Sequence, residues 1–333
     1  MIGHLWARDL LARALARNQL GHSYLFAGPA YIGKTSLALY LASLLVCSSE
    51  DRSPCGTCRG CRRLARGLHP DVTLVSRDAD KRDIAIEQIR QIEQDLSLQP
   101  YEAMHKLVCI CGADRMNDAA SSALLKTLEE PPQGATLVLT AEEPMALPST
   151  VRSRCQMITL QPVPAPVIAD GLVADYGVEP GTAAELAALA RGRPGWAVGA
   201  LTDEARVEHE RAARLSVGGL AGAGPFARID AVATWLGKGT FVELRERALE
   251  LLSRLESWWR DALLLALSSR APGLARHRLG EADARGVDVP GIVCFLALIQ
   301  EATYQVQANV VPRLALENLI TGMPRVGSRG DGW

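Results

Sequence analysis

Short apolar runs recur along the first half of the chain, and segments with helical periodicity separate most of them. The five predicted strands are residues 23–27, 72–75, 107–111, 136–140 and 156–160. Near-continuous apolar strands that alternate with helices indicate a parallel sheet covered on both faces. The sequence therefore predicts an α/β domain with a parallel five-stranded sheet.

The pattern changes after the fifth predicted strand. Alternating prolines in residues 161–166 favour an extended linker, which sets the first domain boundary. Beyond it the strand signal fades, and residues 182–185 form a capping box before an apolar helical series. Long helical patterns such as residues 241–268 follow. We predict three domains: an α/β domain over residues 1–163, a helical lid over residues 164–205 and a helical domain over residues 206–333.

Composition and charge narrow the class of protein. The 36 Lys and Arg residues against 37 Asp and Glu residues leave a formal net charge of -1, so a nucleic-acid role would need a local patch or a partner. No uninterrupted apolar run approaches the roughly 18 residues of a membrane span. The first ten residues place charges every few positions and indicate an amphipathic helix, not a signal peptide. We expect a globular protein of the reducing cytoplasm with no membrane partner.

A phosphate-binding motif follows the first predicted strand. Residues 28–35 satisfy the G-x4-G-K-[ST] pattern and precede a predicted helix over residues 36–45. In such a loop the glycines let backbone N–H groups surround phosphates, the lysine neutralises oxygens and the threonine can ligate Mg²⁺. Tyr31 stands where many P-loops have a third glycine, and its bulk could crowd a phosphate. The alternative is a coincidental glycine-rich turn, which the flanking strand and helix disfavour. We predict that ATP or ADP, with Mg²⁺, binds at Gly28, Gly33, Lys34 and Thr35.

The motif lacks the acids that hydrolysis requires. A P-loop hydrolase needs one carboxylate to hold Mg²⁺ and a neighbouring one to polarise water, both at the end of a later strand. Cys111 and Gly112 occupy these positions at the end of the third predicted strand, and neither can do either job. Asp114 lies two to three residues too far along. We expect the chain to hold a nucleotide without hydrolysing it.

Four of the eight cysteines crowd into one stretch with the spacing C-x7-C-x2-C-x2-C. Disulfides are rare in the cytoplasm, and four thiolates can close a tetrahedral zinc shell. The run lacks the further x3-C-Pro of a bacterial ferredoxin, so an iron–sulfur cluster is the weaker choice. We predict one structural Zn²⁺ in a module inserted at about residues 47–61, held by Cys47, Cys55, Cys58 and Cys61.

Two groups of arginines are candidates for contact with anions. The first surrounds the cysteines: Arg52, Arg59, Arg62, Arg63 and Arg66. These side chains would favour thiolates and could offer a basic surface, but they could equally form a solvated face. The second candidate is Arg154, just before the fifth predicted strand, which could reach a γ-phosphate across a subunit interface as arginine fingers do. Taken alone, such an arginine is more often part of a surface salt bridge.

Several of these motifs together resemble the bacterial DNA polymerase III clamp loader, a family within the AAA+ class. The matching segments are residues 22–26, the P-loop, the four cysteines, and residues 69–71, 123–132 and 153–155. They cover most of residues 1–160, whereas the helical part matches only at residues 257–261 and 309–316. The resemblance implies a P-loop AAA+ domain followed by two all-helical domains, in a crescent-shaped pentamer whose C-terminal domains form a collar.

Three departures separate the chain from the motor subunits gamma and tau, which share most of these motifs. Cys111 and Gly112 replace the acidic pair of the motor. Gly195 falls where the motor has a nucleotide-sensing arginine, and Ala141 stands near the position of its polar sensor. The resemblance therefore favours a delta-prime-like subunit.

A delta-prime-like subunit is the stationary, non-hydrolysing part of the DNA polymerase III holoenzyme that helps to load the sliding clamp onto primed DNA. The resemblance implies that Arg154 completes the ATP site of a neighbouring subunit. The implied partners are the gamma or tau and delta subunits and, through the complex, the sliding clamp and primer-template DNA. Two alternatives stay open. One is a gamma/tau-like motor ATPase that uses Asp114 or Glu129 as its acid; the other is an isolated zinc-bearing module that binds nucleotide or DNA, against which the long helical C-terminal region argues.

Overall fold

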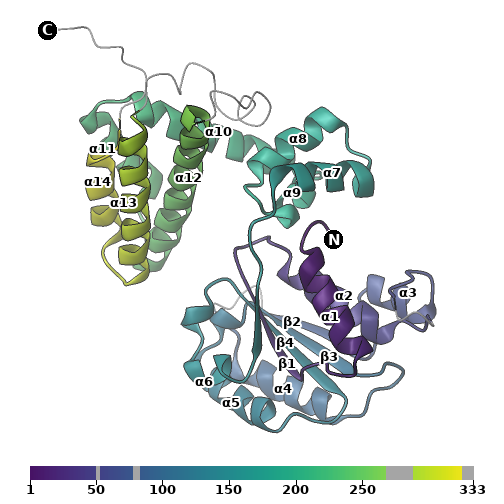
Figure 1. Cartoon of the computed structure of the whole chain (residues 1–333). Helices are drawn as coiled ribbons and strands as arrows, with labels where there is room; N and C mark the ends of the chain where they lie inside the picture. Colours follow the sequence, from purple (N-terminus) through teal and green to yellow (C-terminus); the bar gives the residue numbers. More distant parts are fainter. Residues whose placement is uncertain (50–52, 78–82, 268–287, 325–333) are drawn as a thin grey trace, which may run out of the picture. The chain divides into compact units, whose positions relative to one another are not determined.

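The computed structural model describes residues 1–49, 53–77, 83–267 and 288–324, which divide into two units, Met1–Leu201 and Thr202–Trp333 (Figure 1). The first unit contains both the sheet and the three helices that follow it. The predicted boundary at residues 205 and 206 falls inside the first turn of α10 (Glu204–Gly222), and the three-domain division stays a prediction.

One parallel sheet with the strand order β2-β3-β4-β1-β5 forms the centre of the first unit. Its strands are β1 (Ser23–Ala27), β2 (Val72–Ser76), β3 (Lys106–Cys111), β4 (Ala135–Ala141) and β5 (Gln156–Thr159). Every residue of β1 and β4 is buried, as near-continuous apolar strands covered on both faces require. The five predicted strands are confirmed, each within one residue at either end.

Helices cover both faces of this sheet (Figure 1). Because side chains alternate along a strand, Leu107 and Cys109 of β3 face one core, and Val108 and Ile110 face the other. The first core lies under α1 (Leu5–Ala16) and α2 (Lys34–Val46), and α3 (Arg59–Ala65) packs beside α2. The second core lies under α4 (Ile86–Ser97), α5 (Asp118–Glu129) and α6 (Ser149–Arg152). Two 3₁₀ turns, η1 (Ala113–Arg115) and η2 (Pro144–Ala146), follow β3 and β4.

Three short helices complete the first unit: α7 (Ala165–Tyr176), α8 (Pro180–Leu189) and α9 (Pro194–Ala200). The capping box predicted at residues 182–185 is wrong, because α8 begins earlier. The carboxylate of Glu179 accepts a hydrogen bond from the backbone N–H of Thr182 at 2.9 Å and is the actual cap. Pro180 then occupies the first helical position, where its missing N–H costs nothing.

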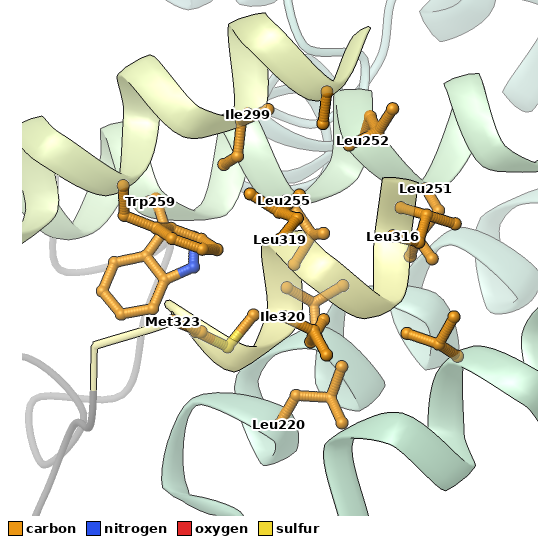
Figure 2. Packing of buried hydrophobic residues seen from close by; sticks show 14 of the residues in the cluster. Leu220, Leu251, Leu252, Leu255, Trp259, Ile299, Leu316, Leu319, Ile320 and Met323 are labelled. Carbon is orange, nitrogen blue, oxygen red and sulfur yellow. The ribbon is translucent and has the colours of Figure 1, made fainter. Parts of the chain in front are cut away.

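The described part of the second unit consists of five helices: α10, α11 (Pro225–Leu236), α12 (Phe241–Leu267), α13 (Val289–Gln307) and α14 (Pro312–Thr321). Figure 2 shows side chains of α10, α12, α13 and α14 meeting in one core. Trp259 is fully buried there and meets the ring of Phe295 edge-on, with 5.3 Å between centroids. The buried guanidinium of Arg228 donates to the carbonyls of Leu220 and Ala221 in the last turn of α10 and to those of Met323 and Pro324 just after α14. The predicted helical region after the α/β domain is confirmed.

Among the described residues, α13 is the helix whose length and apolar composition would suffice to cross a membrane. Five of its side chains lie in the core of the second unit: Ile292, Phe295, Ile299, Ala302 and Val306. We therefore interpret α13 as a core helix of that unit.

Candidate nucleotide site and cysteine cluster

The P-loop connects β1 to α2 and needs glycine at two positions. Gly28 has a φ of 143°, and a Cβ atom there would lie 2.6 Å from the carbonyl oxygen of Leu160. Gly33 has a φ of 111° and is the N-cap of α2. A larger residue at either position would distort the loop, because L side chains rarely adopt these conformations. The first N–H groups of α2 are thus free to face an anion.

Lys34 is buried at the start of α2, and its ammonium group lies against the loop. Its Nζ donates to the carbonyl oxygens of Gly28 at 2.7 Å and Pro29 at 2.8 Å. Burial lowers the pKa of Lys34, and the negative charges of Glu142 and Asp114 oppose that effect. An ammonium group has three N–H bonds, so two hold the loop and one is left for a phosphate oxygen.

A cavity of about 330 Å³ opens beside the P-loop at the carboxyl ends of the strands. Ligands of open parallel sheets bind at this edge. The lining residues are Tyr31, Gly33, Lys34, Thr35, Ser36, Cys111, Gly112, Thr140, Glu142 and Gly195. Three of the four predicted nucleotide-binding residues therefore line one cavity, and Gly28 shapes the loop beneath them.

Tyr31 joins the P-loop to α9. Its φ of 60° is left-handed, which is uncommon for a residue with a side chain, and the side chain is half exposed. Its carbonyl oxygen accepts a hydrogen bond from the backbone N–H of Gly195 at 2.9 Å. A Cβ atom at Gly195 would lie 2.8 Å from the same oxygen. An arginine at this position would therefore push α9 away from the loop.

Cys111 lies in the cavity where a hydrolase would carry its acidic residue. Its Sγ lies 3.9 Å from Oγ1 of Thr35 and 3.8 Å from Sγ of Cys109. The hydrogen bond with Cys109 lowers the pKa of Cys111 to about 7, against the effect of burial. Gly112 follows in a left-handed conformation with a φ of 75°. Neither residue brings a carboxylate to the threonine that would hold Mg²⁺.

The two acids considered for a hydrolysing site lie outside the cavity lining. Asp114 Oδ2 accepts the backbone N–H groups of Glu142 and Glu143, each at 3.0 Å, and so holds the end of β4. Glu129 forms an ion pair with Arg154. Neither residue is thus placed as the acid of a motor subunit.

Besides Ser36, which directly follows the P-loop, sequence reasoning missed two polar residues of the cavity, Thr140 and Glu142. Thr140 Oγ1 accepts the backbone N–H of Gly112 at 3.0 Å, and it lies one residue before Ala141, which the resemblance places near the polar sensor of the motor. Glu142 is the acid that lines the cavity. Both come at the carboxyl end of β4, next to β1, and polar residues at that position were the signal that could have identified them.

Arg154 lies on the surface after α6, away from the cavity lining of its own chain. Its guanidinium pairs with Oε1 of Glu129 at 2.7 Å and donates to the carbonyl oxygen of Thr150 at 3.0 Å. The side chain is 36% exposed. Another molecule can therefore reach this guanidinium, in competition with Glu129.

The four clustered cysteines converge as predicted: the sulfur atoms of Cys47, Cys55, Cys58 and Cys61 all lie within 4.8 Å of one another. A tetrahedral site with Zn–S bonds of about 2.3 Å separates its sulfurs by about 3.8 Å, so this cluster fits one metal ion. The set offers four thiol ligands and no oxygen ligand, a combination that suits soft or borderline metals.

Backbone N–H groups also point at these sulfurs. They run from Cys55 to Cys47 at 3.4 Å, from Cys58 to Cys55 at 3.3 Å and from Cys61 to Cys58 at 3.4 Å. Such donors favour the charged thiolate, and they lower the pKa of Cys58 to about 5, whereas burial raises the pKa of Cys61 to about 12. The cluster also fixes α3, since Cys58 is its N-cap.

Comparison with known proteins gives matches along most of this unit. Residues 5–164 match the sequence family described as DNA polymerase III, delta subunit. The DNA polymerase III subunit delta' of Bacillus subtilis is 38% identical over 164 residues, which are 49% of this chain and 49% of that protein. The delta' subunit of Escherichia coli is 27% identical over 88% of this chain and 82% of that protein. The tau subunit of Escherichia coli is 33% identical over 48% of this chain and 25% of that protein.

The chain spans about half the length of the delta' subunits from Bacillus subtilis and Pseudomonas aeruginosa, at 49% and 46%. Among solved structures, a gamma subunit-related protein of Thermotoga maritima is 19% identical over 95% of this chain and 97% of that chain, with a TM-score of 0.37. The RuvB branch migration motor of the same organism is 18% identical over 80% of this chain and 76% of that chain, with a TM-score of 0.43.

Proposed function

We propose that this chain, whose residues 5–164 belong to the family described as DNA polymerase III, delta subunit, acts as a delta-prime-type subunit of the replicative clamp loader. The observation that carries the proposal is the cavity beside the P-loop. Cys111 and Gly112 occupy the positions of the catalytic acids, next to Thr35. A subunit built in this way can bind nucleotide and serve an assembly, but it lacks the carboxylates of a motor.

The P-loop is proposed to bind ATP or ADP with Mg²⁺. The N–H groups at the start of α2 and the third N–H of Lys34 would contact phosphate oxygens, and the Thr35 hydroxyl would ligate Mg²⁺. Glu142 is the carboxylate that remains in the cavity, but it follows β4 and not β3. We expect turnover by the isolated chain to stay near background.

The cysteine cluster is proposed to hold one structural Zn²⁺. Four thiolates fill a tetrahedral shell and leave no position open to water, so the ion would stabilise the link between α2 and α3.

Arg154 is proposed to act on the ATP of a neighbouring subunit. It would exchange its carboxylate partner Glu129 for phosphate oxygens, with which a guanidinium can pair through two hydrogen bonds. The proposed neighbours are gamma or tau and delta subunits, and the assembly would act on the sliding clamp and primer-template DNA in the cytoplasm. Through Arg154, this chain would contribute to ATP hydrolysis by a neighbouring subunit, although it lacks the catalytic acidic pair itself.

The test is an ATPase assay on the isolated chain and on a reconstituted clamp loader with clamp and primed DNA. The isolated chain should hydrolyse ATP at background rate, and Arg154→Ala should lower the rate of the complex, since well-studied arginine fingers contribute roughly 10³ or more. Arg90→Ala, an exposed arginine of α4, is the matched control and should leave that rate unchanged.

Two results would contradict the proposal. Robust hydrolysis by the isolated chain that Lys34→Ala abolishes would favour the gamma/tau-like motor. An unchanged rate of the complex with Arg154→Ala would make this arginine an ordinary surface residue.

A further inference from the structure

Helix α3, which follows the cysteine cluster, carries a row of arginines. Their spacing of three and four residues places them on one side of the helix, where they line a hollow of about 270 Å³. The α3 arginine face consists of Arg59, Arg62, Arg63 and Arg66. Arg52 was grouped with them in the sequence and lies outside the described residues. Cys58 caps the helix and Cys61 is buried in it, so the cluster holds this face in place.

Among the described residues, one carboxylate pairs with the α3 arginine face. Arg63 pairs with Oε1 of Glu102 at 2.8 Å. Within the described ranges, Arg59, Arg62 and Arg66 have no carboxylate within ion-pair distance, and all three are exposed. Like charges three or four residues apart destabilise a helix, so an anion bound in the hollow would relieve a repulsion already present.

Three exposed arginines of the second unit are paired, unlike Arg59, Arg62 and Arg66. Arg211, Arg260 and Arg313 of the second unit each pair with a glutamate on the same helix, three or four residues away. The feature that sets the α3 arginine face apart is that its four guanidinium-bearing side chains line one hollow.

An exposed aromatic residue is the chain neighbour of the glutamate that pairs with this face. Tyr101 is 79% exposed and directly precedes Glu102, the partner of Arg63. The buried carboxylate of Asp71 accepts the backbone N–H groups of Tyr101 at 2.6 Å and Glu102 at 2.8 Å. The backbone that carries the tyrosine is therefore fixed, although its ring faces solvent.

We propose that the α3 arginine face and Tyr101 form a binding site for single-stranded nucleic acid, with the guanidinium groups on backbone phosphates and a base stacked on the tyrosine ring. Basic grooves beside exposed aromatic rings bind single strands in this way. A paired duplex offers phosphates but no free base face to the ring, so the aromatic contact favours the single strand. The site is separate from the nucleotide cavity and requires neither ATP nor a partner subunit.

The experiment measures the binding of a fluorescein-labelled oligothymidylate of about 20 nucleotides to the full chain by anisotropy, at salt concentrations from about 50 to 200 mM. For single strands, the slope of log K against log salt falls by about 0.7 for each phosphate neutralised. The triple variant Arg59→Ala, Arg62→Ala, Arg66→Ala should therefore have a slope smaller by about 2, and at the lowest salt it should bind at least about tenfold more weakly.

Two further triple variants make this measurement specific. Arg211→Ala, Arg260→Ala, Arg313→Ala removes the same charge from the second unit and should change affinity less than about twofold, since these arginines do not line the hollow and already pair with glutamates on their own helices. The variant Arg59→Lys, Arg62→Lys, Arg66→Lys keeps the charge and should preserve the slope. Circular dichroism checks the folding of each variant.

Tyr101→Ala separates stacking from charge. This substitution should lower the affinity for the oligothymidylate by about fivefold or more. It should leave the slope of log K against log salt unchanged, because stacking contributes affinity without ion release. A duplex of equal length should bind the parent protein more weakly and respond little to this substitution.

The proposal is overturned if the triple alanine variant of α3 binds the oligothymidylate as tightly as the parent does. It is also overturned if the triple alanine variant of the second unit loses as much affinity, or if the triple lysine variant has a smaller salt slope than the parent. A Tyr101→Ala variant with parental affinity, or tighter binding of the duplex, overturns the single-strand mode. These outcomes are independent of the ATPase assays, so a failure here leaves the proposed clamp-loader role standing.

Discussion

The carboxylate of Asp71 holds the loop that follows α4, and its replacement by the amide of asparagine is the sharpest stability test that the first unit offers. Asp71 directly precedes β2 and is 1% exposed. Its two oxygens accept three consecutive backbone N–H groups, from Tyr101 at 2.6 Å, Glu102 at 2.8 Å and Ala103 at 2.9 Å. Asp71→Asn keeps the size of the side chain but replaces one acceptor oxygen with an NH₂ donor.

The expected cost follows from these contacts. A hydrogen bond to a charged acceptor contributes about 1.5–3 kcal/mol, and a buried donor left without a partner costs about 1–3 kcal/mol. Water can reach part of this surface loop, so we expect Asp71→Asn to lower the free energy of unfolding by about 3 kcal/mol. For a unit of this size the midpoint temperature should fall by about 6–12 °C.

The effect should depend on pH. Burial acts to raise the pKa of Asp71, but the three N–H donors and His69 outweigh it and hold the pKa below its usual value. A carboxyl with a depressed folded-state pKa contributes stability above its unfolded pKa of about 3.9 and loses it as the pH falls through the folded value. The difference between the parent and Asp71→Asn should therefore be full at neutral pH and shrink below about pH 4.

Thermal unfolding followed by circular dichroism between neutral pH and about pH 3 measures both effects. Asp9→Asn, on the exposed side of α1, is the matched control and should leave the midpoint within about 1 °C of the parent. If Asp71→Asn unfolds at the parental temperature, or if its deficit grows as the pH falls, the reasoning from the three N–H bonds is refuted.

Three other substitutions test separate parts of the chain. Gly195→Ala places a Cβ atom 2.8 Å from the carbonyl oxygen of Tyr31 and should cost about 1–3 kcal/mol in thermal unfolding; an unchanged midpoint would contradict that contact. Cys58→Ser should reduce bound zinc from about one ion per chain to near zero by elemental analysis, while Cys294→Ser, at an exposed cysteine, retains it. Trp259→Ala should lower the stability of the second unit by about 3–5 kcal/mol, and a loss below about 1 kcal/mol in denaturant unfolding would mean that the core there closes around the gap.

Elements that depend on near neighbours in the sequence were predictable. The five strands follow from apolar runs, and the P-loop follows from residues 28–35, because backbone conformation and phosphate recognition are local there. The convergence of the cysteines was also predictable, since three of them lie within seven residues. In each case, short-range spacing constrains the geometry.

Contacts between distant segments were not predictable. Thr140 and Glu142 enter the cavity because β4 lies beside β1, and strand order is a long-range property. The pairing of Arg154 with Glu129 joins a loop to the end of α5. The predicted cap of α8 was wrong for another reason. Glu179, three residues upstream of Thr182, is the N-cap residue in place of Thr182.

The hydrogen bond between Gly195 and Tyr31 consists of main-chain atoms only, so no side-chain substitution other than Gly195→Pro removes its donor. Other substitutions can change only how closely α9 approaches the loop. The donor is one of the first N–H groups of α9, which a helix leaves without an internal partner. An ester linkage in place of the amide at Gly195, introduced by semisynthesis, would remove this single donor. Such backbone editing is the way to ask whether a change in the P-loop is transmitted to α9.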